Sequence, residues 1–171
     1  MQKVVYEEKP AVIEKVVSVG VVTTALRFDI EQTEDGWECD EVVLCHKEPN
    51  LDFSEIKKAV IDYINAKTDE RILTGFQWNG INVWLSEENQ RNFSEAQRVA
   101  LMTSGQSLPV TFKLGEDANG EPVYHEFTTT EELTGFYLAA VAFIQQCLSE
   151  GWQQKDNMDW SKYEEPKGTQ N

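Results

Sequence analysis

The sequence predicts an α+β fold in which antiparallel β-hairpins pack against two or three helices, preceded by an N-terminal β-ribbon. Asn79-Gly80, the strongest signal for a two-residue hairpin turn, lies between two short apolar runs. Apolar residues recur at helical spacing from Leu133 to Leu148. The stretch from Val12 to Ile30 is rich in β-branched residues, which favour strands.

The N-terminal part is predicted to be an extended arm followed by the ribbon. Residues 1–10 are polar and mixed in charge, as expected of an arm. The β pattern resumes after Asp35-Gly36, so residues 26–32 and 37–45 are predicted to pair as a hairpin.

This ribbon is strongly acidic. Seven acidic residues and no basic residue lie between Phe28 and Val42. Like charges on adjacent strands repel each other. We therefore expect a partner, a cation or another part of the fold to neutralise them.

A domain boundary is predicted at Glu48-Pro49-Asn50, where turn-forming residues interrupt the pattern. This divides the chain into an N-terminal arm and ribbon (1–48), an α+β domain (49–160) and a mobile acidic tail (161–171). The ribbon is expected to serve in oligomerisation or docking.

Two helices are predicted before residue 110. The first begins with Asp52 as its cap and extends to about Lys67. The second is capped by Ser86 and ends at Gly105. Its expected buried residues are Phe93, Ala96, Val99, Ala100 and Met102.

The hairpin at Asn79-Gly80 organises the domain, because its register places apolar residues together on one face. A single hairpin is only marginally stable, so helices must pack on it. The predicted pairs are Thr74 with Leu85, Gly75 with Trp84, Phe76 with Val83, Gln77 with Asn82, and Trp78 with Ile81.

A further hairpin and a terminal helix complete the prediction. Residues 108–114 and 123–127 read as paired strands joined by a polar loop. The last helix begins near Thr129 and contains the apolar series that ends at Leu148. We expect it to cross the apolar face of the central hairpin.

Composition excludes several classes of function. The formal net charge of −15 disfavours binding to nucleic-acid phosphates, which depends on cationic residues. No apolar run reaches the roughly 18 residues of a transmembrane helix, and the N-terminus lacks the pattern of a signal peptide. The three cysteines are an odd number and do not suggest a disulfide framework. The acidity indicates a solvated surface or, alternatively, imitation of the charge of DNA.

Acid–base chemistry has few candidates. The chain has two histidines, His46 and His125, and the second alternates with apolar residues on a predicted strand. No nucleophile elbow, phosphate-binding loop or zinc-protease helix is present. We therefore expect a protein without enzymatic activity and without a cofactor.

Two sets of residues have the right types for a metal, but their spacing is poor. Cys39, Cys45, His46 and Cys147 could supply four zinc ligands, yet Cys45 and His46 are adjacent on a strand and point to opposite faces. Residues 117–121 offer oxygen ligands near a glycine, but the segment is too short for a calcium loop of the EF-hand type. A packed strand and a polar hairpin loop explain the same residues.

Large aromatic residues outside the predicted core are the candidate interface residues. Exposed rings often anchor protein–protein contacts. The alternative is that the ribbon or the tail covers them. The four residues are Trp37, Trp84, Trp152 and Trp160.

Residues 54–150 resemble a small domain encoded by tailed bacteriophages and prophages, commonly in or beside tail-fibre genes. The resemblance rests on the hairpin Gly75–Trp84, the following segment 86–90 and the aromatic-rich helix containing residues 143–148. It implies a virion tail component or a factor that assists tail-fibre assembly, present in the virion or in the bacterial cytoplasm during assembly. It implies no catalytic residue.

The leading hypothesis is therefore a non-enzymatic tail protein that binds other tail or fibre proteins and forms a homo-oligomer. The unpaired edges of the ribbon suit strand addition by another chain. The alternative is an acidic inhibitor of a host DNA-binding or defence protein. A metal-dependent enzyme or hydrolase would require Cys45, His46 and Cys147 to converge at a cleft.

Overall fold

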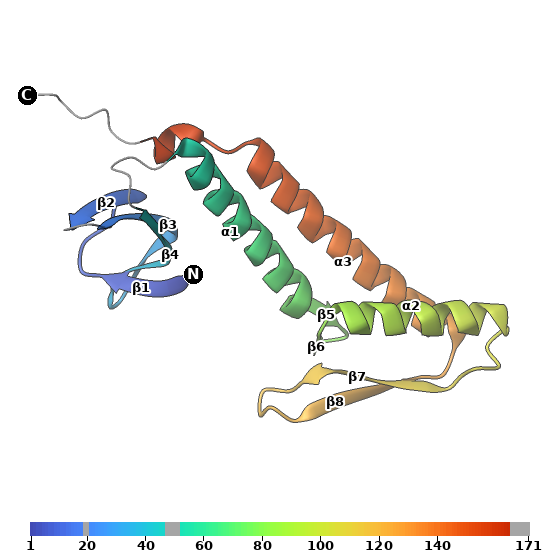
Figure 1. Ribbon diagram of the computed structural model, residues 1–171. Helices are drawn as coiled ribbons and strands as arrows, with labels where there is room; N and C mark the ends of the chain where they lie inside the picture. Colours follow the sequence, from blue (N-terminus) through green and yellow to red (C-terminus); the bar gives the residue numbers. More distant parts are fainter. Residues whose placement is uncertain (19–20, 47–51, 165–171) are drawn as a thin grey trace, which may run out of the picture. The chain divides into compact units, whose positions relative to one another are not determined.

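The computed structural model describes residues 1–18, 21–46 and 52–164. These ranges contain three α-helices and antiparallel sheets, which confirms the α+β class (Figure 1). None of the described helices combines the length and hydrophobicity that a membrane span requires.

The chain divides into two compact units. The first comprises Met1–Ile64 with Lys155–Asn171, and the second comprises Asn65–Gln154. The boundary predicted at residues 48–50 lies outside the described residues. Because the division falls within two helices, each unit contains part of both.

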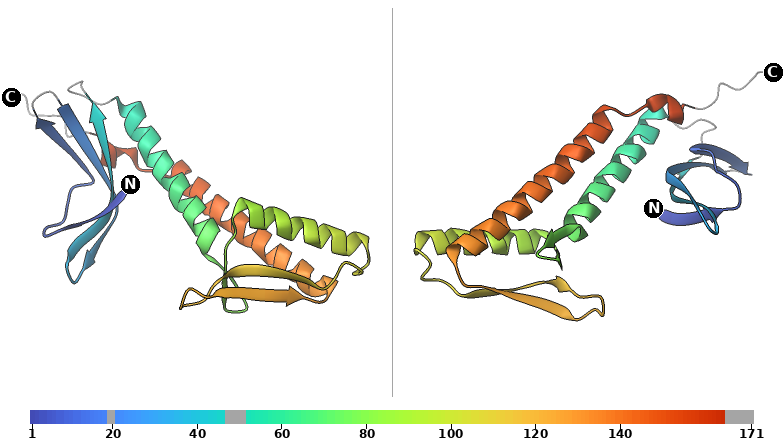
Figure 2. Two further views of the ribbon diagram at one scale, coloured as in Figure 1. Left: turned by 60° about the horizontal axis from the view of Figure 1, so that its bottom comes forward. Right: turned by 180° about the vertical axis from the view of Figure 1, so that it is seen from behind.

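The first unit holds a four-stranded antiparallel sheet in the order β1-β4-β3-β2 (Figure 2). The predicted hairpin is confirmed as β3–β4, with longer strands than expected. The prediction that residues 1–10 form only an arm is wrong, because β1 pairs with β4 along its whole length. The strands are β1 (Gln2–Tyr6), β2 (Ile13–Ser18), β3 (Val21–Thr33) and β4 (Gly36–His46).

One face of this sheet packs on the first half of helix α1 (Phe53–Thr74). Alternate residues of β3, including Leu26 and Phe28, point to this face and are buried. The ring of Phe28 stacks on Tyr63 of α1, with 4.0 Å between centroids. Burial of these apolar groups is what holds the sheet to the helix.

The C-terminal segment also belongs to the core of the first unit. A short 3₁₀-helix, η1 (Trp160–Tyr163), brings the buried Tyr163 to 6.2 Å from the Phe28 ring. The prediction of a mobile tail is therefore wrong for residues 161–164, because an aromatic side chain docks there. Residues 165–171 of that predicted tail lie outside the described residues.

The opposite face of the sheet is organised by a buried arginine. The Arg27 side chain donates hydrogen bonds to Tyr6 Oη (3.1 Å), Glu41 Oε2 (2.9 Å), Glu14 Oε2 (2.6 Å) and the Ala11 carbonyl (3.0 Å). Tyr6 in turn donates to Glu41 at 2.5 Å. Satisfied charges of this kind are tolerated in an interior, whereas a lone charge is not.

In the second unit, α1 continues to Thr74, so the helix end predicted near Lys67 is wrong. Asp69 and Glu70 are exposed and do not interrupt the helix. The helix stops at Gly75, whose N–H donates to the Arg71 carbonyl at 2.8 Å.

The central hairpin is confirmed as β5 (Phe76–Trp78) and β6 (Ile81–Val83), with the predicted pairs of Phe76, Gln77 and Trp78. Asn79 and Gly80 have φ values of 50° and 80°, as a type I′ turn requires. The outer pairs predicted for Thr74 and Gly75 do not form, because Thr74 is the last residue of α1 and the Gly75 N–H is bonded to the Arg71 carbonyl.

Helix α2 (Glu87–Met102) begins as predicted, since the Asn89 N–H donates to Ser86 Oγ at 3.2 Å. Phe93 and Ala100 are buried. The expectation that Met102 is buried is wrong. Met102 lies about two and a half turns after Phe93 and therefore on the opposite side of the helix.

The third hairpin consists of β7 (Val110–Glu116) and β8 (Pro122–Phe127). The Trp84 N–H donates to the Leu114 carbonyl at 2.8 Å and ties the two hairpins of this unit together. At Gly115 an added Cβ would lie 2.4 Å from the Asn82 carbonyl oxygen, so only glycine allows this approach.

Helix α3 (Thr130–Asp156) covers the hairpins, and within the second unit it lies beside the last part of α1, where Arg71 pairs with Glu150 (Figure 1). Phe136 of α3 is fully buried, with its ring centroid 4.9 to 6.1 Å from those of Phe76, Trp78, Phe93 and Phe127. The prediction that the terminal helix packs on Phe76 and Trp78 is confirmed. These rings form the centre of the second core.

Candidate interaction site

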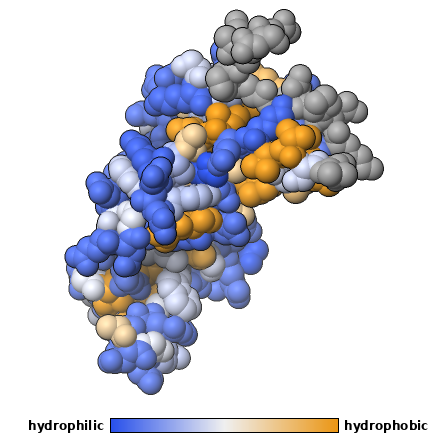
Figure 3. All heavy atoms as spheres, turned by 90° about the vertical axis from the view of Figure 1, so that its left-hand side faces the viewer, coloured by the Kyte–Doolittle hydropathy of each residue, from blue (hydrophilic) through white to orange (hydrophobic). Residues whose placement is uncertain are grey.

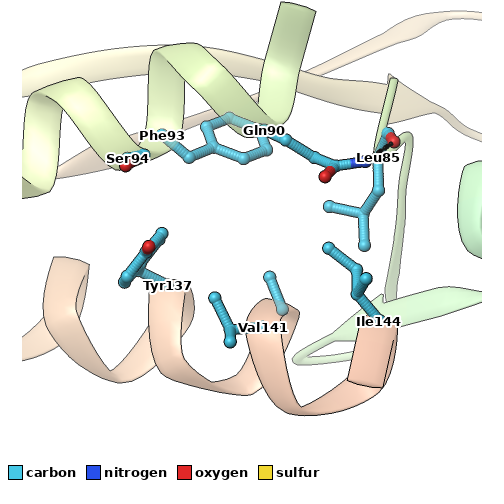
Figure 4. Close-up of a pocket in the computed structure, with 8 residues that line it drawn as sticks. Leu85, Gln90, Phe93, Ser94, Tyr137, Val141 and Ile144 are labelled. Carbon is cyan, nitrogen blue, oxygen red and sulfur yellow. Dashed lines mark hydrogen bonds between the residues drawn. The ribbon is translucent and has the colours of Figure 1, made fainter. Parts of the chain in front are cut away.

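A half-open pocket of about 110 Å³ lies between α2 and α3 in the second unit (Figure 4). It is lined mainly by apolar groups, and its size suits one aliphatic or aromatic side chain. The lining residues are Leu85, Gln90, Phe93, Ser94, Tyr137, Ala140, Val141 and Ile144.

Local hydrogen bonds fix the upper wall of the pocket. Gln90 Nε2 donates to the Leu85 carbonyl at 2.6 Å, and Asn89 Nδ2 donates to the Trp84 carbonyl at 2.8 Å. These bonds hold the segment before α2 against the first turn of the helix. The ring of Phe93 makes an edge-on contact with the ring of Phe136, with 4.9 Å between their centroids.

The pocket suits binding rather than catalysis. Among the described residues that line it, none has a carboxylate, imidazole or thiol group. Tyr137, Gln90 and Ser94 supply the polar atoms. Such a lining can accept an apolar side chain and hydrogen-bond a neighbouring amide or hydroxyl.

Of the three cysteines among the predicted zinc ligands, Cys39 and Cys147 are buried and Cys45 is exposed. His46 Nε2 lies 3.1 Å from Thr24 Oγ1. Cys45 and His46 are adjacent on β4, where consecutive side chains point to opposite faces of the sheet. Among the described residues, no three or more His, Cys, Asp or Glu side chains form a group that could hold a metal ion.

The other candidates for chemistry have structural partners as well. His125 Nε2 lies 2.9 Å from Glu132 Oε1. Asp117 Oδ1 accepts hydrogen bonds from the N–H groups of Asn119 (2.8 Å) and Glu121 (3.0 Å). This carboxylate therefore closes the β7–β8 loop, as a turn-forming aspartate does.

The fold itself neutralises part of the acidic ribbon. Glu41 is paired with Arg27, and Glu38 forms an ion pair with Lys3. The Tyr63 hydroxyl lies 2.7 Å from Asp29 Oδ2 and 2.8 Å from Asp40 Oδ2, so the two carboxylates share its one proton as acceptors. A partner, a cation or another part of the fold was expected to neutralise the ribbon. Side chains from other parts of the fold neutralise some of its acidic residues.

Replacing Tyr63 with phenylalanine is expected to cost about 1–3 kcal/mol of unfolding free energy, because two carboxylates lose this donor. Burial first, and then the hydrogen bonds to Asp29 and Asp40, raise the pKa of Tyr63. Its contribution is therefore complete below about pH 10 and declines as the pH rises further, where the tyrosine of the unfolded chain ionises. Urea denaturation of the unmodified protein and of the Tyr63→Phe variant, from pH 7 to 11, measures the difference in unfolding free energy. A difference that grows with pH would contradict the assignment.

Two of the four candidate tryptophans are covered within the first unit. Trp37 is half-buried on β4, and the Lys9 ammonium lies 5.0 Å from its ring centroid. Trp160 is half-buried against Phe53, with 6.2 Å between centroids, and Lys57 lies 5.3 Å away. These contacts favour a role in packing.

The other two tryptophans, in the second unit, are exposed. Trp84 lies beside the Lys113 ammonium at 5.3 Å, and Trp152 on α3 is 52% exposed. Both remain candidates for an interface. The same helix also exposes Leu138, which the sequence-based list did not include.

The first unit displays apolar residues that sequence reasoning did not single out. Val16, Val17 and Val21, at the end of the β2–β3 hairpin, and Val43 on β4 are all exposed. The space-filling view from the side of the sheet shows hydrophobic residues interrupting the hydrophilic surface (Figure 3). The sequence did contain a signal for these exposed residues. The ribbon has more valines than one buried face of a sheet can hold.

Comparison with known proteins gives a match to a protein family. Residues 55–167 match a family described as a domain of unknown function, DUF4376. The match begins inside α1 and leaves out β1 to β4. No curated protein and no solved structure matches the chain. Since the match covers most of the chain, the protein belongs to the DUF4376 family.

Proposed function

We propose that this chain is a non-enzymatic protein of phage or prophage tails, either a structural component or a factor for tail-fibre assembly. It acts through contacts with other proteins. The resemblance of residues 54–150 to phage-encoded domains motivates the proposal. The observation that carries it is the valine-bearing edge strand of the first unit.

Strand β2 is at one end of the described sheet order and has β3 as its neighbour on one side. Val17 on this strand is 71% exposed, and Val16 and Ser18 are exposed as well. β-Branched residues on an edge strand favour pairing with a strand from another chain. The edge carries one lysine, Lys15, and no proline.

The second unit supports the same type of function. Its pocket has an apolar lining and suits an inserted side chain. An apolar pocket with a few polar groups is typical of a binding site. Binding, rather than turnover of a substrate, is what these groups support.

The proposal is tested by co-purification. The full chain is tagged in a host that expresses the tail and fibre proteins encoded beside it, and retained proteins are identified by mass spectrometry. We expect a tail or fibre protein to be retained. Val17→Lys should abolish retention, because it replaces the most exposed apolar side chain of this edge with a charge that an added strand would have to cover.

Val43→Lys is the matched control, because Val43 is 45% exposed but lies on the interior strand β4. Retention should persist in this variant. If the unmodified chain retains no tail or fibre protein, the proposal is wrong. Presence of the chain in purified virions would distinguish a structural component from an assembly factor.

The alternative, an acidic inhibitor that imitates DNA, has weaker support. A mimic requires its carboxylates to be displayed to the partner. In the ribbon, Asp40 and Glu41 are buried, and Glu38 is paired with Lys3. Salt-sensitive binding to a basic host protein would favour this alternative.

A further inference from the structure

A second pocket of the second unit lies between its two hairpins, β5–β6 and β7–β8 (Figure 1). Its volume of about 400 Å³ falls within the range of roughly 300–1,000 Å³ that is usual for small-ligand sites. Its lining is more polar than that of the pocket between α2 and α3, and this suits a different kind of ligand. Functional groups come from Gln77, Asn82, Glu116 and Asp117, and apolar surface from Ile81 and Val123.

The backbones of the two hairpins meet closely beside this pocket. The Trp84 N–H donates to the Leu114 carbonyl at 2.8 Å. An added Cβ at Gly115 would lie 2.4 Å from the Asn82 carbonyl oxygen. The pocket is therefore built on packed strands, which hold its side chains in place better than a loop would.

Two amide side chains in this pocket have unused hydrogen-bonding capacity. Gln77 and Asn82 are cross-strand partners and are exposed, on the face of the hairpin opposite the buried Phe76 and Val83. Within the described ranges, neither side chain forms a hydrogen bond with another residue. Each amide has an oxygen that accepts and an NH₂ group that donates. Together they suit a ligand whose groups both donate and accept.

The two carboxylates at the pocket already have partners. Glu116 Oε1 lies 3.0 Å from the Lys113 ammonium. Asp117 Oδ1 accepts from two backbone N–H groups of its own loop, those of Asn119 and Glu121. A cation would therefore meet little uncompensated charge here. The remaining lone pairs of these carboxylates can still accept hydrogen bonds from hydroxyl groups.

An aromatic ring lies beside the pocket. Trp84 follows Asn82 by two residues, and Val83 between them is fully buried, so Asn82 and Trp84 face the same outer side. Trp84 is 38% exposed. The Lys113 ammonium lies 5.3 Å from its ring centroid and is paired with Glu116, which lines the pocket. The ring thus supplies a flat apolar surface next to hydrogen-bonding groups.

We propose that this pocket binds a neutral sugar ring. Hydroxyl groups both donate and accept, so they match the amides of Gln77 and Asn82 and the carboxylate oxygens of Glu116. The C–H groups on one face of a pyranose ring can pack on the indole of Trp84. A sugar is therefore the class of small ligand that uses both the polar groups and the ring.

Other classes of ligand fit this pocket less well. An anion is repelled by the two carboxylates and by the net charge of −15. A cation gains little, because Glu116 and Asp117 already have partners. An apolar ligand would cover Gln77 and Asn82 without offering them hydrogen bonds, which is costly.

The test is an NMR titration of the full chain with the methyl glycosides of glucose, galactose, mannose and N-acetylglucosamine. At least one should bind with a dissociation constant in the millimolar range, as expected for a ligand of about a dozen non-hydrogen atoms. Saturable shifts should occur at the side-chain amides of Gln77 and Asn82 and at the indole N–H of Trp84.

Substitutions then assign the binding to this pocket. Trp84→Ala should weaken it about fivefold or more, and Trp84→Phe, which keeps a flat ring, should retain most of it. Asn82→Ala should also weaken it about fivefold or more, because hydrogen bonds to a hydroxyl group are lost. Trp152→Ala and Asn92→Ala are the matched controls, since both residues are exposed on helices and neither lines this pocket. They should leave the dissociation constant unchanged, and circular dichroism checks that each variant is folded.

No saturable binding of any of the four glycosides, shifts centred on other residues, or equal losses in Trp84→Ala and Trp152→Ala would each overturn the proposal. Tighter binding of n-butylamine, which carries the ammonium group of a lysine side chain, would indicate a cation site and overturn it too. The pocket shares no residue with the β2 edge. Absence of sugar binding in a chain that retains a tail protein would therefore disprove this proposal while supporting the proposed function.

Discussion

Replacing Arg27 with methionine is expected to lower the unfolding free energy by about 3–5 kcal/mol, as removal of one partner from a buried ion pair does. The Arg27 side chain is 4% exposed, and Glu41 would keep a buried charge without its guanidinium partner. Urea denaturation followed by circular dichroism measures the change. It is expected to affect the unit that contains the four-stranded sheet.

The pH dependence of this loss of unfolding free energy tests whether the unpaired carboxylate of Glu41 causes it. Burial alone would raise the pKa of Glu41, but hydrogen bonds from Tyr6 and Arg27 outweigh it, so that the pKa is lowered overall. A lowered pKa in the folded chain contributes stability above the ordinary glutamate value of about 4.3. This contribution is lost as the pH falls below that value. The difference between the two chains should therefore shrink in acid.

Two further variants serve as controls. Lys58→Met removes an exposed ion pair with Asp62 and should change the unfolding free energy by less than about 1 kcal/mol. Combining Arg27→Met with Glu41→Leu should recover much of the loss, since no buried charge then remains. If the single Arg27 variant is as stable as the unmodified chain, the network does not hold the sheet together.

Replacing Phe136 with alanine is expected to destabilise the second unit by about 3–5 kcal/mol, which combines lost burial with the cost of a cavity. Phe136 is fully buried and contacts rings from both sides of the core. Thermal and urea denaturation, followed by circular dichroism, measure the change.

Leu138→Ala on the same helix is the matched control, because Leu138 is exposed. Its effect on the unfolding free energy of the monomer should stay within about 0.5 kcal/mol. A similar loss for the two variants would mean that Phe136 is not at the centre of the core.

The second unit could largely be predicted from the sequence, because its signals are local. Asn79-Gly80 specifies the turn, and the turn specifies the register of Phe76 and Trp78. Ser86 specifies a helix start through its own side chain. Each of these signals acts within a few residues, so it can be recognised without knowing which distant residues are in contact.

The errors arose where distant contacts decide. Residues 68–70 look like a polar break, and residues 72–74 look like part of a strand. They are nevertheless helical, because α1 has a neighbour in α3, with Arg71 paired to Glu150. Pairing of β1 with β4 joins segments separated by about thirty residues, which no local pattern reveals. Tyr163 becomes a core residue for the same reason.

The candidate site was predicted least well. The sequence drew attention to tryptophans, of which Trp37 and Trp160 pack within the first unit. The pocket between α2 and α3 combines residues from three segments, so its shape depends on how the helices pack. Exposure of Val17 and Leu138 likewise depends on which side of an element the core occupies.

The sheet of the first unit affects where the boundaries of a recombinant fragment should be placed. Ile56, Val60 and Tyr163 all fall within the matched region, and all three are buried with Leu26 and Phe28 of β3, which falls outside it. A fragment trimmed to residues 55–167 would expose the hydrophobic surface that the sheet covers and would be prone to aggregate. Recombinant work on this chain should keep the preceding strands, which complete one of its two hydrophobic cores.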